Sequence, residues 1–205
     1  MIPGNHDWHN GSASGWEAVM REQLYVNFLN QKNARFVPED GCPGPIEINL
    51  SDEVVVVAFD SQWWLHPHDK PEIESDCAVK TSEDLVTQIQ EIATRNARKL
   101  VILACHHPFK SNGSHGGFYT LKQHIFPFTD WRPNLYIPLP LIGSIYPISR
   151  SVFGTPQDLR HPVYQTMVNE ISESLKDIPN LVFVAGHDHN LQHIVDSNRN
   201  YIVSG

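Results

Sequence analysis

Continuous apolar runs predict the buried strands of this chain. The three runs cover residues 54–59, 100–104 and 181–185. Runs of this length and apolar content are typical of strands that are buried on both faces of a sheet. The alternating segment 46–50 precedes the first run across a short turn, so we expect a hairpin there. A second hairpin is expected at residues 191–203, near the end of the chain.

Three segments carry apolar residues at helical spacing, at residues 16–28, 85–92 and 164–175. The residues expected to face the core are Trp16, Val19, Met20, Leu24 and Phe28 in the first segment, Leu85, Ile89 and Ile92 in the second, and Tyr164, Met167, Val168, Ile171 and Leu175 in the third. Ser82 is expected to cap the second helix. Strands and helices alternate, which indicates an α/β architecture with its chemistry at the carboxyl ends of the strands.

The composition is that of an acidic globular protein with an excess of histidine. The 205 residues carry a formal net charge of −8, which argues against a basic surface for nucleic acid or anionic lipid. Twelve histidines are many for this length and point towards metal binding. No window is long and apolar enough to span a bilayer. The three cysteines form no CxxC pair and do not decide the compartment, for which the cell envelope is one interpretation.

Three polar sites follow predicted strands or stand where a strand end is expected. They contain Asn5 with His6, His106 with His107, and His187 with His189. Gly186 frees the turn that carries the last pair out of the sheet. Imidazole nitrogens and amide oxygens are common ligands of transition metals. A turn that happens to contain histidines explains any one site equally well, but the three together favour a shared metal site.

The motifs GNHD, HHP and GHDH occur in this order along the chain, and in this order they resemble the calcineurin-like metallophosphoesterases. The segments between them are most similar to the tartrate-resistant (purple) acid phosphatase branch. The resemblance implies a four-layer α/β/β/α sandwich, incomplete here because its first βα units are absent. It makes residues 1–205 one partial phosphoesterase domain with a proline-rich insertion loop at residues 131–160. It also implies two metal ions, of Fe, Zn or Mn, bridged by a hydroxide.

The resemblance assigns roles position by position. The four implied metal ligands are Asn5, His106 and His187 for the second metal and His189 for the first. His6 is implied to protonate the leaving oxygen or to stabilise the charged phosphoryl group, and Asp7 to hold its ring. His107 is expected on the other face of its strand. His115 is implied to line the substrate pocket, although a solvated loop histidine explains it equally well.

The implied function is metal-dependent hydrolysis of phosphoesters, with a phosphomonoester favoured as the small-molecule substrate and no nucleic acid expected. A phosphodiesterase is the nearest alternative, and a catalytically silent scaffold that binds partner proteins is another. The family opens with Asp-x-His and Gly-Asp-x-x-Asp motifs that supply most ligands of the first metal. Neither precedes Gly4, so we expect the chain to be a fragment that is inactive by itself.

The segment 131–153 is the most distinctive part of the chain, because it is apolar and repeatedly broken by proline. Its prolines predict that it forms no regular helix. An ordered loop packed over the domain is the favoured interpretation. A lid, or a surface that docks on a membrane or a neighbouring domain, is the alternative. Elsewhere, Asp60 is expected in a turn or cap, His66 and His68 in a surface loop, and Cys105 in the core.

Overall fold

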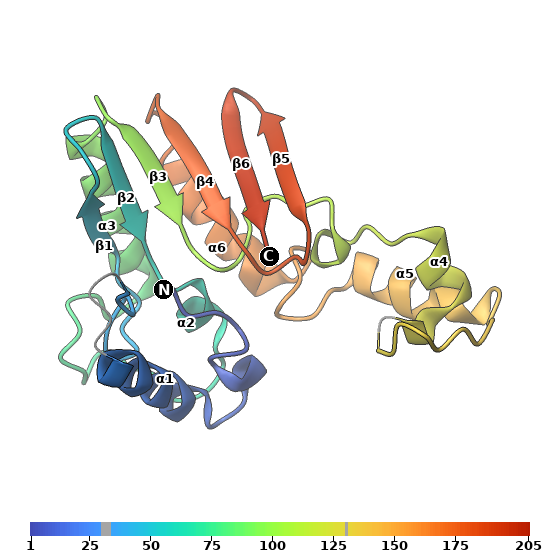
Figure 1. The fold of residues 1–205 in the computed structure, drawn as a ribbon. Helices are drawn as coiled ribbons and strands as arrows, with labels where there is room; N and C mark the ends of the chain where they lie inside the picture. Colours follow the sequence, from blue (N-terminus) through green and yellow to red (C-terminus); the bar gives the residue numbers. More distant parts are fainter. Residues whose placement is uncertain (30–33, 130) are drawn as a thin grey trace.

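A six-stranded sheet forms the centre of the computed structural model, which describes residues 1–29, 34–129 and 131–205 (Figure 1). The strands are β1 (Ile46–Asn49), β2 (Val54–Ala58), β3 (Leu100–Ala104), β4 (Leu181–Ala185), β5 (Leu191–Asp196) and β6 (Arg199–Ser204). They lie in the order β1-β2-β3-β4-β6-β5. The pairs β1–β2 and β5–β6 are antiparallel hairpins, and the other neighbours are parallel. The predicted strands, hairpins and α/β class are therefore confirmed.

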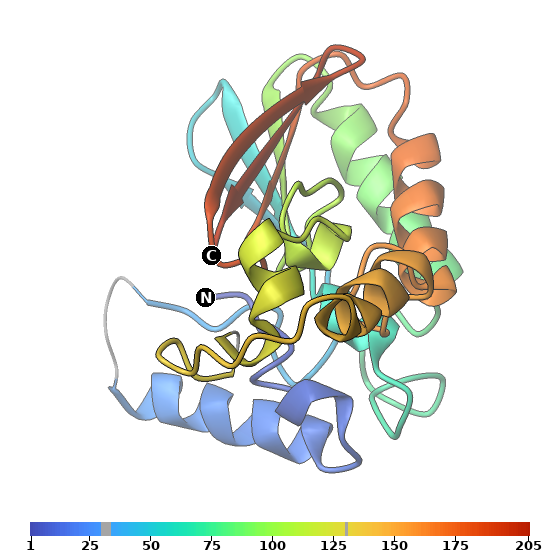
Figure 2. The same cartoon turned by 90° about the vertical axis from the view of Figure 1, so that its right-hand side faces the viewer.

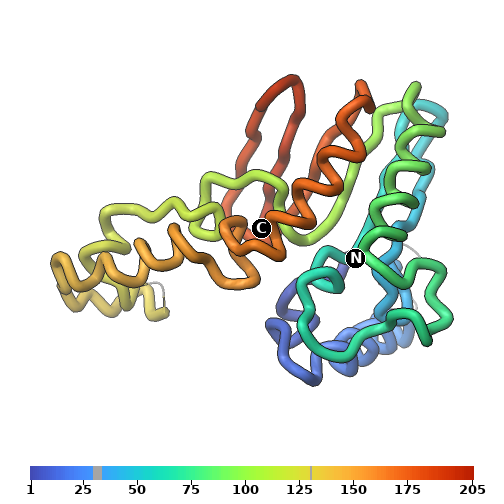
Figure 3. The backbone as a smooth tube through the Cα atoms, turned by 180° about the vertical axis from the view of Figure 1, so that it is seen from behind, coloured from blue at the N-terminus to red at the C-terminus, as the bar shows by residue number. Residues whose placement is uncertain are grey.

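Two long helices, α3 (Ser82–Arg95) and α6 (Pro162–Ser174), cover one face of the sheet (Figures 2 and 3). Because side chains alternate along a strand, every second residue of β2, β3 and β4 is buried under these helices. The shared core includes Val55, Val57, Val101, Leu103, Phe183, Leu85, Ile89, Tyr164, Met167 and Ile171. The predicted inner faces of both helices are confirmed. The cap of α3 is Thr81 rather than Ser82, since the Thr81 side chain accepts from the N–H of Asp84.

The expected four-layer sandwich is not seen in the part of the chain that the structure describes. Its strands all belong to one sheet, with the two long helices on one face. The closing hairpin does not start a second sheet, because β6 pairs in parallel with β4 and β5 continues outward from it. The architecture is a mixed α/β sheet covered by helices.

The helix α1 (Gly15–Leu29) buries a face that fully shares only Val19 with the one predicted. Its buried residues are Gly15, Ala18, Val19, Gln23 and Val26. Trp16, Leu24 and Phe28 are exposed instead. A side chain at Gly15 would overlap the His66 ring, so the small residues of α1 are the ones that pack closely. The helix closes a second, smaller core with Trp8, Phe36 and Trp63.

Two loops beside α1 are joined by a disulfide between Cys42 and Cys77, with Cα atoms 5.7 Å apart. Cys105 is free and buried, as predicted. The loop after α2 (Ser61–Leu65) differs from its prediction, because His66 is buried and its ring packs on Trp8. His68 is exposed, as expected for a surface loop. The segments around α1 and α2 lie beneath the carboxyl ends of the central strands in the view of Figure 1.

Asp60, at the carboxyl end of β2, caps α2 and thereby confirms its predicted role. Its carboxylate accepts from the backbone N–H of Gln62 and Trp63 and from Trp8 Nε1 at 2.7 Å. The group is fully buried, and this burial raises its pKa to about 7 against the opposing effect of the three hydrogen bonds. Asp60 therefore ties the opening turn of the chain to the central sheet.

The raised pKa of Asp60 predicts that stability falls as the pH rises from about 4 to 7. In this window the unfolded chain has released the proton, whereas the folded chain still holds it. The Asp60→Asn variant has no proton to release at this position. Its free energy of unfolding should therefore lack the wild type's fall of up to about 1.4 kcal/mol per pH unit. Urea unfolding at several pH values measures the slope, with the exposed Asp52→Asn variant as control. Equal slopes for Asp60→Asn and the wild type would contradict the prediction.

Residues 118–154 form an arm that projects from the body of the molecule (Figures 1 and 3). The arm contains α4 (Leu121–Ile125), two short 3-10 helices (Pro127–Thr129 and Ile142–Ser144) and α5 (Ile145–Val152). The favoured interpretation of a loop packed over the domain is wrong, because most of the large apolar side chains here are exposed. The expected absence of a regular helix is also wrong. Pro147 lies in the first turn of α5, where helices tolerate a missing N–H.

Candidate metal site

Three side chains from distant parts of the chain converge beside the carboxyl ends of β3 and β4. They are Asn5 in the opening turn, His106 two residues after β3, and His187 two residues after β4. His106 Nε2 lies 2.8 Å from Asn5 Oδ1 and 3.1 Å from His187 Nδ1. A side chain at Gly4 would lie 2.5 Å from His106 Nδ1, so this glycine lets the opening turn approach the ring. The parallel pairing of β3 and β4 brings the two histidines to one edge of the sheet.

Neighbouring hydrogen bonds direct the free electron pairs of Asn5 and His187 towards the shared centre. His187 Nε2 lies 2.8 Å from the carbonyl oxygen of Gln157, which can only accept, so this nitrogen carries the proton. His187 Nδ1 is then free to act as a ligand. Asn5 Nδ2 donates to Asn10 Oδ1 at 3.0 Å, which turns Asn5 Oδ1 towards His106. The surrounding bonds thus set the orientations that a bound cation requires.

Both imidazoles are held in their neutral form. Burial lowers the pKa of His106 to about 4 and that of His187 to about 3. For His187 the neighbouring His115 acts in the same direction. A neutral imidazole keeps the electron pair with which it binds a metal, so neither ring needs to lose a proton near neutral pH.

The donor set fits a transition-metal ion. Two ring nitrogens 3.1 Å apart repel each other unless a proton or a cation lies between them. Two imidazole nitrogens and one amide oxygen suit Zn, Fe or Mn. Because all three donors are neutral, a bound ion would keep its full positive charge. The site therefore favours an anionic group as a further ligand.

His107 belongs to the same cluster of rings but has a different role. The ligand atoms of His106, His107 and His187 lie within 4.8 Å of one another. Both nitrogens of His107 are already bonded, Nδ1 to Ser61 Oγ at 2.9 Å and Nε2 to Gln157 Oε1 at 2.8 Å. The ring is fully buried, and burial lowers its pKa well below the usual value. His107 thus packs against the rings of His106 and His187 and has no free nitrogen with which to bind the ion.

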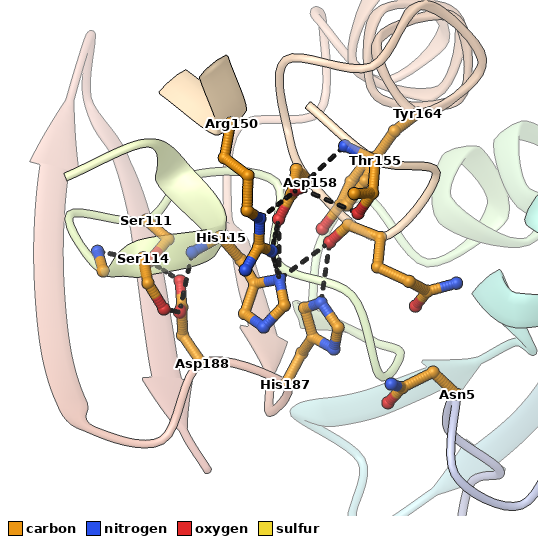
Figure 4. A network of polar contacts seen from close by, with 12 residues as sticks. Asn5, Ser111, Ser114, His115, Arg150, Thr155, Asp158, Tyr164, His187 and Asp188 are labelled. Atoms are coloured by element: carbon orange, nitrogen blue, oxygen red, sulfur yellow. Dashed lines mark hydrogen bonds and ion pairs between the residues drawn. The ribbon is translucent and has the colours of Figure 1, made fainter. Parts of the chain in front are cut away.

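His115 lies against the site and is connected to the arm (Figure 4). Its ring centroid is 3.9 Å from that of His187. Its Nδ1 lies 2.9 Å from Asp158 Oδ1, so the carboxylate fixes the proton on Nδ1 and leaves Nε2 free. Arg150 of α5 binds the same carboxylate, whose pKa these partners and Thr155 hold well below its usual range. The network joins α5 to the histidine cluster.

The structure places three of the predicted site residues outside this centre. His6 and His189 are exposed, although both are near enough to His106 to affect its pKa. The Asp7 carboxylate accepts the N–H of Gly4 at 2.7 Å and so stabilises the opening turn, whereas we expected it to hold the His6 ring. Asn5, His106 and His187 are the predicted ligands that meet. The roles assigned to His6 and His189 stay predictions.

Gln157 and Asp158 are site residues that the sequence did not indicate. Gln157 contacts His187 through its carbonyl oxygen and His107 through its side chain. Asp158 holds His115 from a position 43 residues away in the chain. Both lie in a loop without a motif, and only the folded chain brings them to the cluster. Nothing in their local sequence distinguishes them from loop polar residues.

Comparisons with known proteins do not support the resemblance to the calcineurin-like metallophosphoesterases and their tartrate-resistant acid phosphatase branch, and this assignment is corrected. No family model matches the chain, and no curated protein matches it. Among solved structures the chain is similar to GAP50, described as the anchor in the inner membrane complex of Plasmodium, with 14% identity and a TM-score of 0.44. The match covers 93% of this chain and 45% of GAP50, so the chain spans less than half of that protein.

Proposed function

We propose that the chain binds one transition-metal ion through Asn5 Oδ1, His106 Nε2 and His187 Nδ1, and that this site serves the hydrolysis of phosphoesters. The observation that carries the proposal is the convergence of these three donor atoms, with His106 Nε2 within 3.1 Å of the other two. A bound ion supplies positive charge for phosphoryl oxygens and activates water near neutral pH. Zn, Mn and Fe are the candidate ions.

The surrounding side chains suit an anionic substrate. The three neutral ligands leave the charge of the ion uncompensated, and a phosphomonoester carries more negative charge than a phosphodiester. We therefore favour a phosphomonoester, with a phosphodiester as the alternative. His115 offers its free Nε2 beside His187, where it can contact a bound phosphoryl group. The exposed His6 is accessible to a leaving oxygen and is our candidate proton donor.

The experiment measures metal content and turnover on the same samples. Equilibrium dialysis with Zn²⁺, Mn²⁺ or Fe²⁺, followed by elemental analysis, gives the stoichiometry. 4-Nitrophenyl phosphate and bis(4-nitrophenyl) phosphate then compare monoester with diester hydrolysis. The proposal expects one ion per chain and turnover that requires it. No bound ion, or hydrolysis that persists after chelation, would contradict it.

A scaffold that binds partner proteins without catalysis is the second candidate function. One observation favours it: among the described residues, the cluster provides converging ligands for one ion, whereas the expected two-metal chemistry needs more. His189, the expected ligand of the other metal, is exposed and lies outside the cluster. A chain that binds one ion tightly but hydrolyses neither ester would favour the scaffold. The acidic composition gives no reason to expect a nucleic acid as partner.

A further inference from the structure

The arm, residues 118–154, exposes an unusual amount of apolar surface. Its exposed large apolar residues are Phe118, Leu121, Phe128, Trp131, Tyr136, Ile137, Leu141, Ile142, Ile145, Tyr146, Ile148, Val152 and Phe153. Leu141 is 88% exposed and Trp131 is 74% exposed. Isolated exposed apolar residues are normal, but a continuous group of this size marks an interaction surface.

Five of these exposed apolar residues line a groove, and the others lie outside it. The groove has a volume of about 790 Å³ and lies between Phe128, Trp131, Ile142, Ile145 and Tyr146. Leu121 in α4 and Phe153 after α5 are exposed outside this groove. A partner segment seated in the groove would leave such side chains in water, whereas a fluid apolar phase can cover them as well. This distribution favours lipid over a protein surface.

The charges of the arm differ from those of the rest of the chain. The chain carries a net charge of −8, but the arm has three basic residues, Lys122, Arg132 and Arg150, and one acidic residue, Asp130. Arg150 is neutralised by Asp158 at the base of the arm. Within the residues that the structure describes, Lys122 and Arg132 form no ion pair and can meet an external anion. The overall acidity that argued against anionic lipid therefore does not apply to the arm.

Lys122 and Arg132 each lie beside an exposed aromatic ring. Lys122 Nζ lies 5.0 Å from the centre of the Tyr136 ring, and the Arg132 guanidinium lies 5.0 Å from the centre of the Trp131 ring. Tryptophan and tyrosine prefer the boundary between lipid headgroups and acyl chains, and neighbouring basic side chains reach the headgroups. Pairs of this kind suit an anionic membrane surface.

We propose that the arm docks on the surface of an anionic lipid bilayer, with the apolar side chains of residues 141–153 entering the headgroup boundary. No helix in the described residues is long and apolar enough to cross a membrane, so the arm would lie in the interface. Arg150 binds Asp158, which in turn binds His115, so the docked arm would be connected directly to the candidate metal site.

Vesicle flotation of the full chain tests the proposal, using phosphatidylcholine vesicles with and without an equal part of phosphatidylglycerol. The variant Leu141→Glu/Ile145→Glu places charges on the exposed apolar surface of the arm. The matched control, Leu24→Glu/Phe28→Glu, changes two exposed apolar residues of α1, away from the arm. All four positions are exposed, so both variants should fold, and circular dichroism checks this. A third variant, Lys122→Ser/Arg132→Ser, removes the free charges.

The proposal expects the wild type and the α1 control to float with the anionic vesicles. Leu141→Glu/Ile145→Glu should weaken this binding at least about ten-fold. Lys122→Ser/Arg132→Ser should also weaken it about ten-fold, with less effect on neutral vesicles. Wild type that fails to float would overturn the proposal, as would an equal loss in the α1 control. Self-association in solution that depends on Leu141 and Ile145, without flotation, would identify a protein contact instead and equally overturn it.

Discussion

Replacing Cys42 and Cys77 by serine should lower the free energy of unfolding by about 3–4 kcal/mol. The disulfide joins residues 35 positions apart and connects two long loops beside α1. Without it the unfolded chain gains the conformational freedom of that loop, whereas the folded chain loses only a covalent link. The effect is large because the disulfide closes a long loop in the unfolded chain.

Guanidinium unfolding of the oxidised wild type and the Cys42→Ser/Cys77→Ser variant measures the difference. The reduced wild type should match the variant, which controls for the serine side chains. A difference below about 1 kcal/mol would mean that other contacts already hold the loops. Structural disulfides persist in oxidising compartments, which agrees with the interpretation of a cell-envelope location. That location stays a prediction.

His106→Ala should weaken metal binding more than about 100-fold, since even the loss of a residue that only supports a ligand costs up to that factor. His106 Nε2 contacts both other donor atoms, so its removal leaves Asn5 and His187 without a common centre. His193→Ala is the control, because it also removes one imidazole from the protein, but this ring is exposed and lies on β5, away from the cluster. Competition with a chromophoric chelator measures both affinities.

The low pKa values of the two ligand histidines add a pH dependence to the same measurement. Protons compete with the metal only below the pKa of each imidazole, about 4 for His106 and about 3 for His187. As the pH is lowered, metal binding should therefore persist to about pH 5. Histidines with an ordinary pKa near 6.5 would lose the ion at a higher pH. Equal affinities of His106→Ala and the wild type would exclude this cluster as the binding site.

The sheet could be predicted from the sequence because each central strand is a continuous apolar run that only a buried position tolerates. The face of α1 could not. Its apolar residues Leu24 and Phe28 are exposed, while Gly15 and Gln23 are buried. The close approach of α1 to the His66 ring determines which face of the helix is buried. Nothing in the local sequence of α1 indicates this contact. Likewise, the pairing of Cys42 with Cys77 depends on loops whose course the sequence does not determine.

The candidate site could be predicted where a histidine follows the end of a predicted strand, as His106 and His187 do. Gln157 was not predictable, because it lies in an irregular loop after the arm and only the folded chain brings this loop to His187 and His107. The short motifs also suggested a family that the comparisons do not support. A motif of three or four residues specifies a turn and a donor atom, whereas family membership depends on the whole sheet and its connections.

His187 adopts a backbone φ of 68°, in the left-handed region that side chains other than glycine rarely occupy. This conformation costs roughly 1 kcal/mol that a glycine at position 187 would not incur. A glycine would recover that cost only by giving up a buried ring and its hydrogen bond to the Gln157 carbonyl oxygen. The chain therefore tolerates an unfavourable backbone at position 187, and this backbone places an imidazole where the end of the strand turns away.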